Sequence, residues 1–158
     1  MSVQRLLIIL LLFSASVIQL QAQTMTNTKL EKIISSVSDT IIGQNGAWEF
    51  RFGDLPMLCI TDENHNRMRI IAPIAEMKDI TVEQMKTAME ANFHSALDVK
   101  YAISDEVMWA AYIHPLKQLQ NEQTLDAIRQ VYNAVLTFGT SYTSTELSFP
   151  KRKKEKRS

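Results

Sequence analysis

Cysteine, glycine and proline are scarce in this sequence. Its 158 residues include one cysteine, four glycines and four prolines. A single cysteine excludes a disulfide framework and any zinc site built from several cysteines. The few glycines and prolines exclude a collagenous chain, and the 46% of hydrophobic residues excludes a wholly disordered one. The length allows one ordinary domain of about 100–200 residues.

Long apolar runs are also rare, and the clearest one stands near the N-terminus. Arg5 precedes residues 6–13, which are all apolar, and the apolar character fades before Leu20-Gln21-Ala22. The run is shorter than the ~20 residues of a membrane-spanning helix, and the small Ala22 stands where a signal peptidase would cut. We therefore predict a signal peptide over residues 1–22 and a periplasmic or secreted protein. An uncleaved signal anchor is the alternative.

The charges balance over the whole chain but not along it. Of 17 basic residues, one lies within residues 1–22 and six lie within residues 151–157, which also hold one of the 17 acidic residues. The body between them keeps 10 basic and 16 acidic residues, so its net charge is −6. We predict that residues 143–158 form a basic, disordered tail, with weak contact to anionic surfaces as a second role. The acidic body argues against nucleic-acid binding.

Hydrophobic periodicity predicts a single α+β domain over residues 25–142. Apolar residues recur at helical spacing from Leu30 to Ile41, whereas the aromatic residues of 47–52 alternate with charged ones as in a half-buried strand. These periods predict the order α-βββ-α-ββ-α, an antiparallel sheet with helices packed on one face. The predicted helices are 29–42, 81–98 and 121–138, and the predicted strands are 47–52, 57–61, 67–74, 99–103 and 107–113.

Alternation along the strands and spacing along the middle helix predict the core. The strand residues expected on the inner face are Trp48, Phe50, Met68, Ile70, Val107 and Trp109. The buried stripe expected on the middle helix is Met85, Ala88, Met89, Phe93 and Ala96.

Motifs that carry chemistry are missing or incomplete. The three histidines are spread along the chain, and none of them forms an H-x-x-x-H or H-E-x-x-H motif. Residues 62–66 begin like a calcium loop, but Arg67 stands where such a loop needs glycine. Cys59 lies inside a predicted strand, where a buried and inert thiol is expected. We predict a protein that is not an enzyme and that uses neither cofactor nor metal.

Two stretches, 48–57 and 67–74, show an apolar strand, a turn, a second strand and a third strand that leads into the middle helix. With the order of elements over residues 28–140, this pattern resembles the type III secretion chaperone fold (the Tir-chaperone type) and the related bacterial sensory-transduction-regulator domain. The resemblance implies a secretion-chaperone-like fold. It also implies that the sheet and the middle helix make dimer or partner contacts.

We therefore predict an exported, non-enzymatic domain that binds another protein, with a chaperone-like or assembly role and with homodimerisation left open. The candidate partner-binding residues alternate with core residues, which sends them to the face of the sheet away from the helices. Arginine is favoured in interfaces because its planar fork pairs with carboxylates. Pairing with neighbouring strands is the simpler role for these side chains. The candidates are Glu49, Arg51, Arg67 and Arg69.

The alternative function is binding of a small molecule or lipid in a pocket between helix and sheet. Aromatic side chains would line this pocket, namely Trp48, Phe50, Trp109 and Tyr112.

Overall fold

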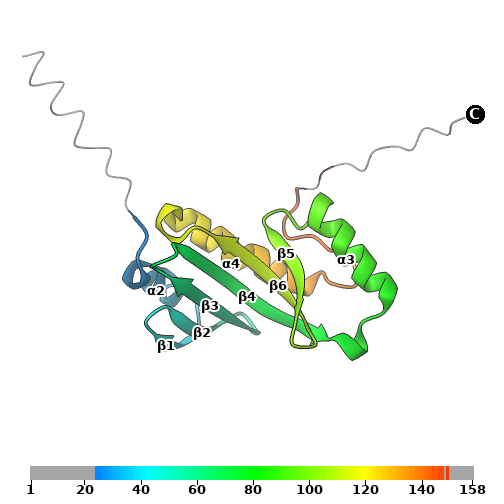
Figure 1. The fold of residues 1–158 in the computed structure, drawn as a ribbon, viewed down its shortest axis with the longest axis horizontal. Helices are drawn as coiled ribbons and strands as arrows, with labels where there is room; N and C mark the ends of the chain where they lie inside the picture. Colours follow the sequence, from blue (N-terminus) through cyan, green and yellow to red (C-terminus); the bar gives the residue numbers. More distant parts are fainter. Residues whose placement is uncertain (1–23, 148, 150–158) are drawn as a thin grey trace, which may run out of the picture.

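The computed structural model describes residues 24–147 and residue 149. Within them, six strands form one antiparallel sheet in the order β1-β2-β3-β4-β6-β5 (Figure 1). This is the predicted α+β class with one strand more than predicted. The strands are β1 Thr40–Gln44, β2 Ala47–Phe52, β3 Leu55–Asp62, β4 Arg67–Glu76, β5 Val99–Ser104 and β6 Val107–His114. The helices are α2 Asn27–Ser35, α3 Val82–His94 and α4 Asn121–Leu136, with short 3-10 turns η2 Met77–Asp79 and η3 Leu116–Gln118.

The additional strand corrects the predicted first helix, 29–42. The Thr26 hydroxyl caps α2, which ends at Ser35, and the chain then enters β1. Serine and aspartate in 36–39 are poor helix formers, whereas the β-branched side chains of Thr40 and the two residues after it favour a strand. Ile41 packs against the core, but it does so from β1 rather than from the predicted helix.

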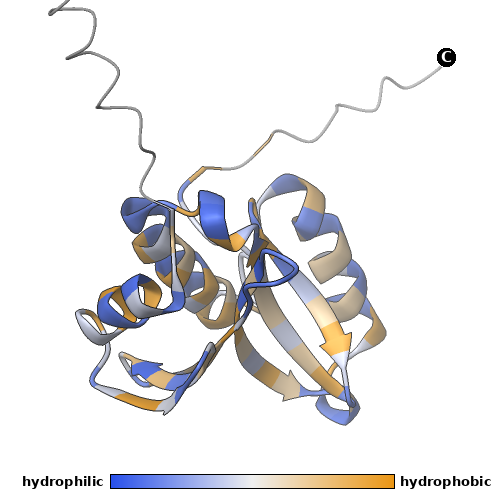
Figure 2. Cartoon of the chain, turned by 60° about the vertical axis from the view of Figure 1, so that its left-hand side comes forward, coloured by the Kyte–Doolittle hydropathy of each residue, from blue (hydrophilic) through white to orange (hydrophobic). Residues whose placement is uncertain are grey.

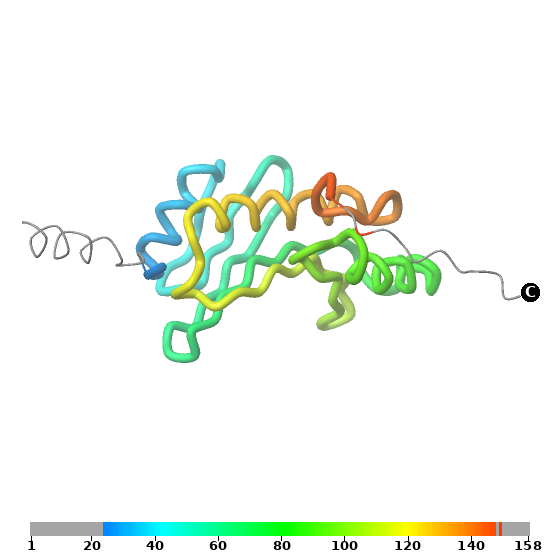
Figure 3. The backbone as a smooth tube through the Cα atoms, turned by 90° about the horizontal axis from the view of Figure 1, so that it is seen from above, coloured from blue at the N-terminus to red at the C-terminus, as the bar shows by residue number. Residues whose placement is uncertain are grey.

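Helices cover one face of the sheet and one of its edges. α4 packs against β4, β5 and β6, and α2 packs against α4 and β1 (Figure 3). The middle helix α3 instead packs beside the edge strand β5 (Figure 1). Among the described residues, no helix covers the opposite face, which we call the outer face.

The core lies between the sheet and the helices α2 and α4. Trp48, Phe50, Met68 and Ile70 are buried there, as predicted. Strands and helices outside this layer also carry apolar residues (Figure 2). Hydropathy alone therefore does not identify which residues are buried.

The predicted orientation of β6 is wrong. Met108, Ala110 and Tyr112 point into the core and are buried, whereas Val107 and Trp109 are half-buried on the outer face, where Ala111 is also buried.

The predicted stripe on the middle helix is correct only in part. Ala88 and Ala96 are buried and Met85 is half-buried, but Met89 and Phe93 are 64% and 80% exposed. Within α3 itself, the buried residues are the small Ala88 and Ala91.

The packed domain continues slightly beyond residue 142, where the tail was predicted to begin. Ser144 is buried, and its hydroxyl donates a hydrogen bond to the Ala96 carbonyl oxygen at 2.8 Å. The predicted signal peptide, residues 1–22, and the basic segment 151–157 lie outside the described residues. Among the described residues, each helix is too short or too polar to cross a lipid bilayer.

Candidate functional site

The four predicted partner-binding residues are exposed on the outer face of the sheet. Glu49 stands opposite Leu58, and Arg51 opposite Pro56, in the β2–β3 pair. On β4, Arg67 and Arg69 alternate with two buried residues and point away from the core. The structure thus places all four side chains on the predicted face, and their role in binding stays a prediction.

Apolar residues separate these charged side chains, and sequence reasoning missed them. Leu58, Ile71 and Ala111 stand opposite one another on the neighbouring strands β3, β4 and β6. This apolar row lies between Arg51 at one end of the outer face and the arginines of β4 at the other. The sequence pattern that could have revealed them is that β3, β4 and β6 carry apolar residues on both faces. Such a pattern is typical of strands that are covered on both sides.

One end of the outer face carries a basic depression of about 310 Å³. Arg69 stands opposite Ile60 and Ile113, which are 40% and 62% exposed. Among the described residues, the Arg69 guanidinium has no hydrogen-bond partner, while Arg67 donates to the Asn66 carbonyl oxygen at 3.1 Å. The lining residues are Ile60, Thr61, Asp62, Arg67, Met68, Arg69 and Ile113.

The one carboxylate in this depression, that of Asp62, is hydrogen-bonded to His65. Asp62 accepts a hydrogen bond from the His65 main-chain N–H at 2.9 Å, and its other oxygen lies 2.7 Å from His65 Nδ1. These hydrogen bonds, the main-chain one foremost, lower the pKa of Asp62. Asp62 therefore stays ionised, and with the two arginines its charge leaves a net charge of +1 on the lining of this depression.

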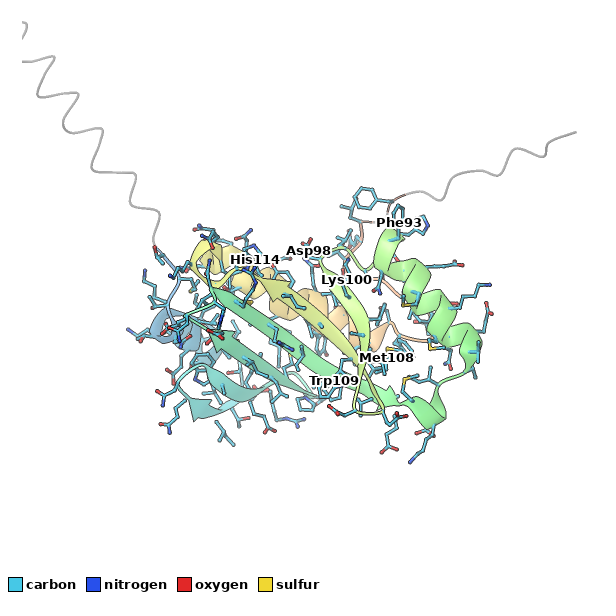
Figure 4. The ribbon with its side chains drawn as sticks, viewed as in Figure 1. Phe93, Asp98, Lys100, Met108, Trp109 and His114 are labelled. Atoms are coloured by element: carbon cyan, nitrogen blue, oxygen red, sulfur yellow. The ribbon has the colours of Figure 1, made fainter. Side chains whose placement is uncertain are left out.

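The other end of the outer face carries a second depression, of about 210 Å³ around Trp109, in which Glu49 is the one charged lining residue. The Trp109 indole N–H donates to the Ser104 carbonyl oxygen on the neighbouring strand β5 at 3.2 Å, and Trp109 lies on β6 near the β5–β6 turn (Figure 4). Arg51 stands opposite the lining residue Pro56, and its Nη2 donates to the Asp54 carbonyl oxygen at 2.8 Å. The lining residues are Glu49, Pro56, Met57, Leu58, Pro73 and Trp109.

A second exposed apolar surface follows α3. Val82, Met89 and Phe93 are 76%, 64% and 80% exposed, and their spacing of seven and four residues places them on one side of the helix. Phe93 stands near the C-terminal end of α3, at the far end of the molecule from α2 (Figure 4). We call these three residues the α3 stripe.

Other residues considered from the sequence do not form a site. Cys59 is buried as predicted, and burial raises the pKa of its thiol to about 12. His65 lies in the β3–β4 turn, His94 ends α3 and His114 ends β6. Within the described part of the chain, no three histidine, cysteine, aspartate or glutamate side chains are placed to hold a metal ion.

The predicted ligand pocket between helix and sheet is not formed by the residues proposed for it. Trp48, Phe50 and Tyr112 fill the core, whereas Trp109 lies on the outer face. The four aromatic side chains therefore cannot line one cavity.

Comparison with known proteins gives a likeness of fold. No protein-family model matches the chain, and no curated protein matches it in sequence. A chain of a solved structure described as the HopA1–SchA chaperone–effector complex matches with a TM-score of 0.56 and 12% sequence identity. The match covers 70% of this chain and 90% of that one. The chain thus has a secretion-chaperone-like α+β fold.

Proposed function

We propose that this protein binds a segment of another protein on the outer face of its sheet, in a chaperone-like or assembly role. One observation carries the proposal: the apolar row of Leu58, Ile71 and Ala111 crosses a face that no described helix covers, and Leu58 also lines the depression at Trp109. The fold likeness to a chain of a chaperone–effector complex is consistent with a protein-binding role.

The shape of the outer face favours a protein ligand over a small molecule. Small-molecule sites are concave and bury most of the ligand, whereas this face offers two shallow hollows joined by an apolar strip. An apolar centre with charged groups at its margin is the usual layout of a protein interface. This layout also supports a non-enzymatic role.

We also propose that two copies associate through the α3 stripe. The support is the exposure of Val82, Met89 and Phe93, since a helix face of large apolar side chains in water marks an interaction site. The surface lies beyond the β5 edge, so it leaves the outer face open for the partner.

Export remains part of the proposal and rests on residues 1–22 alone. Removal of this segment would leave Gln23 as the first residue of a periplasmic or secreted form. Intact-mass measurement of the protein recovered outside the cytoplasm tests this directly. Recovery of the full 158-residue chain in membranes would contradict it.

Affinity capture with matched variants tests the binding proposal. Ile60→Asp and Ile113→Asp together place two carboxylates on the exposed part of the outer face, where neither wild-type side chain is fully buried. Leu136→Asp makes the same kind of change at an exposed site on α4. We expect a stoichiometric protein partner with the wild type and with Leu136→Asp, but not with the double variant. Recovery of that partner by a folded double variant would contradict the proposal.

A further inference from the structure

Three large apolar side chains are exposed near the point where the described chain ends. Phe93, Leu147 and Phe149 are 80%, 58% and 56% exposed. The Phe149 main-chain N–H donates to the His94 carbonyl oxygen at 2.7 Å, so Phe149 lies against the C-terminal end of α3, where Phe93 also stands. Figure 4 shows Phe93 at this end of the molecule. We call these three residues the apolar end.

The basic segment, residues 151–157, follows the apolar end directly in the sequence. Two residue steps separate Phe149 from Lys151, which is at most about 7 Å of chain. The segment carries six positive charges and one negative charge, and residues 143–158 together have a net charge of +4. The first positive charges therefore stand beside exposed apolar side chains.

Apolar side chains next to clustered lysine and arginine are typical of proteins that bind the surface of a lipid bilayer. Anionic head groups attract the basic residues, and each one near the surface strengthens binding about fivefold. Large apolar side chains enter the boundary between the head groups and the acyl chains. The strength of such binding rises both with the buried apolar area and with the attraction to anionic lipid.

The charge of the rest of the chain favours contact at this end alone. Outside residues 1–22 and 151–157, the chain has a net charge of −6. An anionic surface repels this body and attracts the basic segment, so the field turns the apolar end toward the surface. A soluble polyanion would use the positive charges only, whereas a bilayer also takes up the apolar side chains.

We propose that the apolar end and the basic segment together attach the protein to a bilayer that contains anionic lipid. The three apolar side chains enter the interface, and the lysines and arginines of the segment lie among the head groups. This inference goes beyond the proposed function, because it does not involve the outer face. Phe93 also belongs to the α3 stripe, so a copy attached to lipid does not pair with a second copy through that stripe at the same time.

Co-sedimentation with lipid vesicles tests the attachment. The protein is the chain from Gln23 to Ser158, which contains the whole described core and omits the apolar run of residues 6–13 that would itself enter lipid. One set of vesicles is phosphatidylcholine alone, and the other contains equal amounts of phosphatidylcholine and phosphatidylglycerol. We expect the protein to sediment with the mixed vesicles and to stay in solution with phosphatidylcholine alone.

Two variants separate the apolar contribution from the charged one, and both leave Phe93 unchanged. Leu147→Ser with Phe149→Ser should weaken binding to the mixed vesicles by about tenfold, because two exposed apolar side chains no longer enter the lipid. Replacing Lys151, Arg152 and Lys153 by glutamine should weaken it by at least about tenfold. Ile42→Ser is the control: this side chain is 72% exposed on β1, at the opposite edge of the sheet, and its loss should leave binding unchanged. Circular dichroism confirms that each variant is folded.

Three results would overturn the inference. The first is a wild type that sediments with neither set of vesicles, and the second is equal binding to both sets. The third is loss of binding in the glutamine variant with full binding in the Leu147→Ser and Phe149→Ser variant, which would identify the segment as a general polyanion-binding tail. None of these results bears on partner binding at the outer face, which the capture experiment decides.

Discussion

The side-chain amide of Asn92 bonds both main-chain groups of Tyr101. Its Nδ2 donates to the Tyr101 carbonyl oxygen at 3.1 Å, and its Oδ1 accepts from the Tyr101 N–H at 2.7 Å. Tyr101 lies on the edge strand β5, so an amide from α3 stands where the next strand would bond. Edge strands commonly need such cover, because their unpaired main-chain groups attract other chains. The same two bonds attach α3 to the sheet.

Replacing Asn92 by alanine should destabilise the domain. The substitution leaves both main-chain groups of Tyr101 unbonded in a partly buried place, which costs about 1–3 kcal/mol. Urea unfolding measures the free energy of unfolding. Asn64→Ala in the exposed β3–β4 turn is the matched control and should change it by less than about 0.5 kcal/mol. Equal effects of the two substitutions would contradict the role assigned to Asn92.

The two tryptophans should respond differently to truncation. Trp48 is 2% exposed in the core, so Trp48→Ala should cost about 3–5 kcal/mol of unfolding free energy. Trp109 is half-buried on the outer face, so Trp109→Ala should cost less than half as much. Thermal or urea unfolding of both variants checks this order. A larger loss at Trp109 would mean that β6 has the orientation expected from sequence.

The tryptophans also show why the sequence predicts some strands better than others. In β2 the aromatic residues alternate with Glu49 and Arg51, so the period alone identifies the inner face. From Val107 to Ile113 every residue of β6 is apolar, and alternation cannot decide between the two faces. The irregular pairing between Pro73 and Ala75 also shifts the register of β4 against β6, which no local pattern reveals.

The sequence predicts the charged residues of the candidate site but not the apolar row at its centre. The same alternation placed Glu49 and the three arginines on the outer face, as the structure has them. The apolar row and the depression at Trp109 depend on which strands become neighbours. That order follows from the pairing of β4 with β6, two strands that the middle helix and β5 separate in the sequence. Similarly, the helical period of the middle helix predicts a buried face that includes Phe93. Only the packing of α3 beside β5 decides that Phe93 is exposed.

The buried thiol of Cys59 should make stability fall at high pH. The pKa of this thiol is about 12 in the folded protein against 9.0 ordinarily, because burial disfavours the thiolate. The unfolded chain loses this proton above about pH 9 while the folded chain keeps it. The stabilising contribution is therefore complete below pH 9 and is lost as pH rises toward 12. The loss approaches ~1.4 kcal/mol per pH unit.

Comparison with Cys59→Ala isolates this effect from other groups that titrate at high pH. Urea unfolding of both proteins between about pH 8 and 10.5 should show a steeper decline for the wild type. Parallel pH profiles of the wild type and the alanine variant would contradict the assigned burial.

Replacing Phe93 by serine should change association rather than folding. The side chain is 80% exposed, so its loss should alter the unfolding free energy by no more than ~0.5 kcal/mol. If the α3 stripe joins two copies, sedimentation velocity should show a dimer for the wild type and a monomer for Phe93→Ser. Leu136→Ser, at an exposed site on α4, should leave the dimer intact. A wild type that is monomeric at all concentrations would contradict the proposed dimer.

Site-specific photo-crosslinking tests whether the outer face of the sheet binds another protein. A photoreactive phenylalanine analogue at Ile60 or Ile113 reports on the outer face, and one at Leu136 reports on the helical side of the domain; all three side chains are exposed. We expect the same covalently joined partner from both outer-face positions in living cells and none from Leu136. A partner captured at Leu136 and at neither Ile60 nor Ile113 would contradict it.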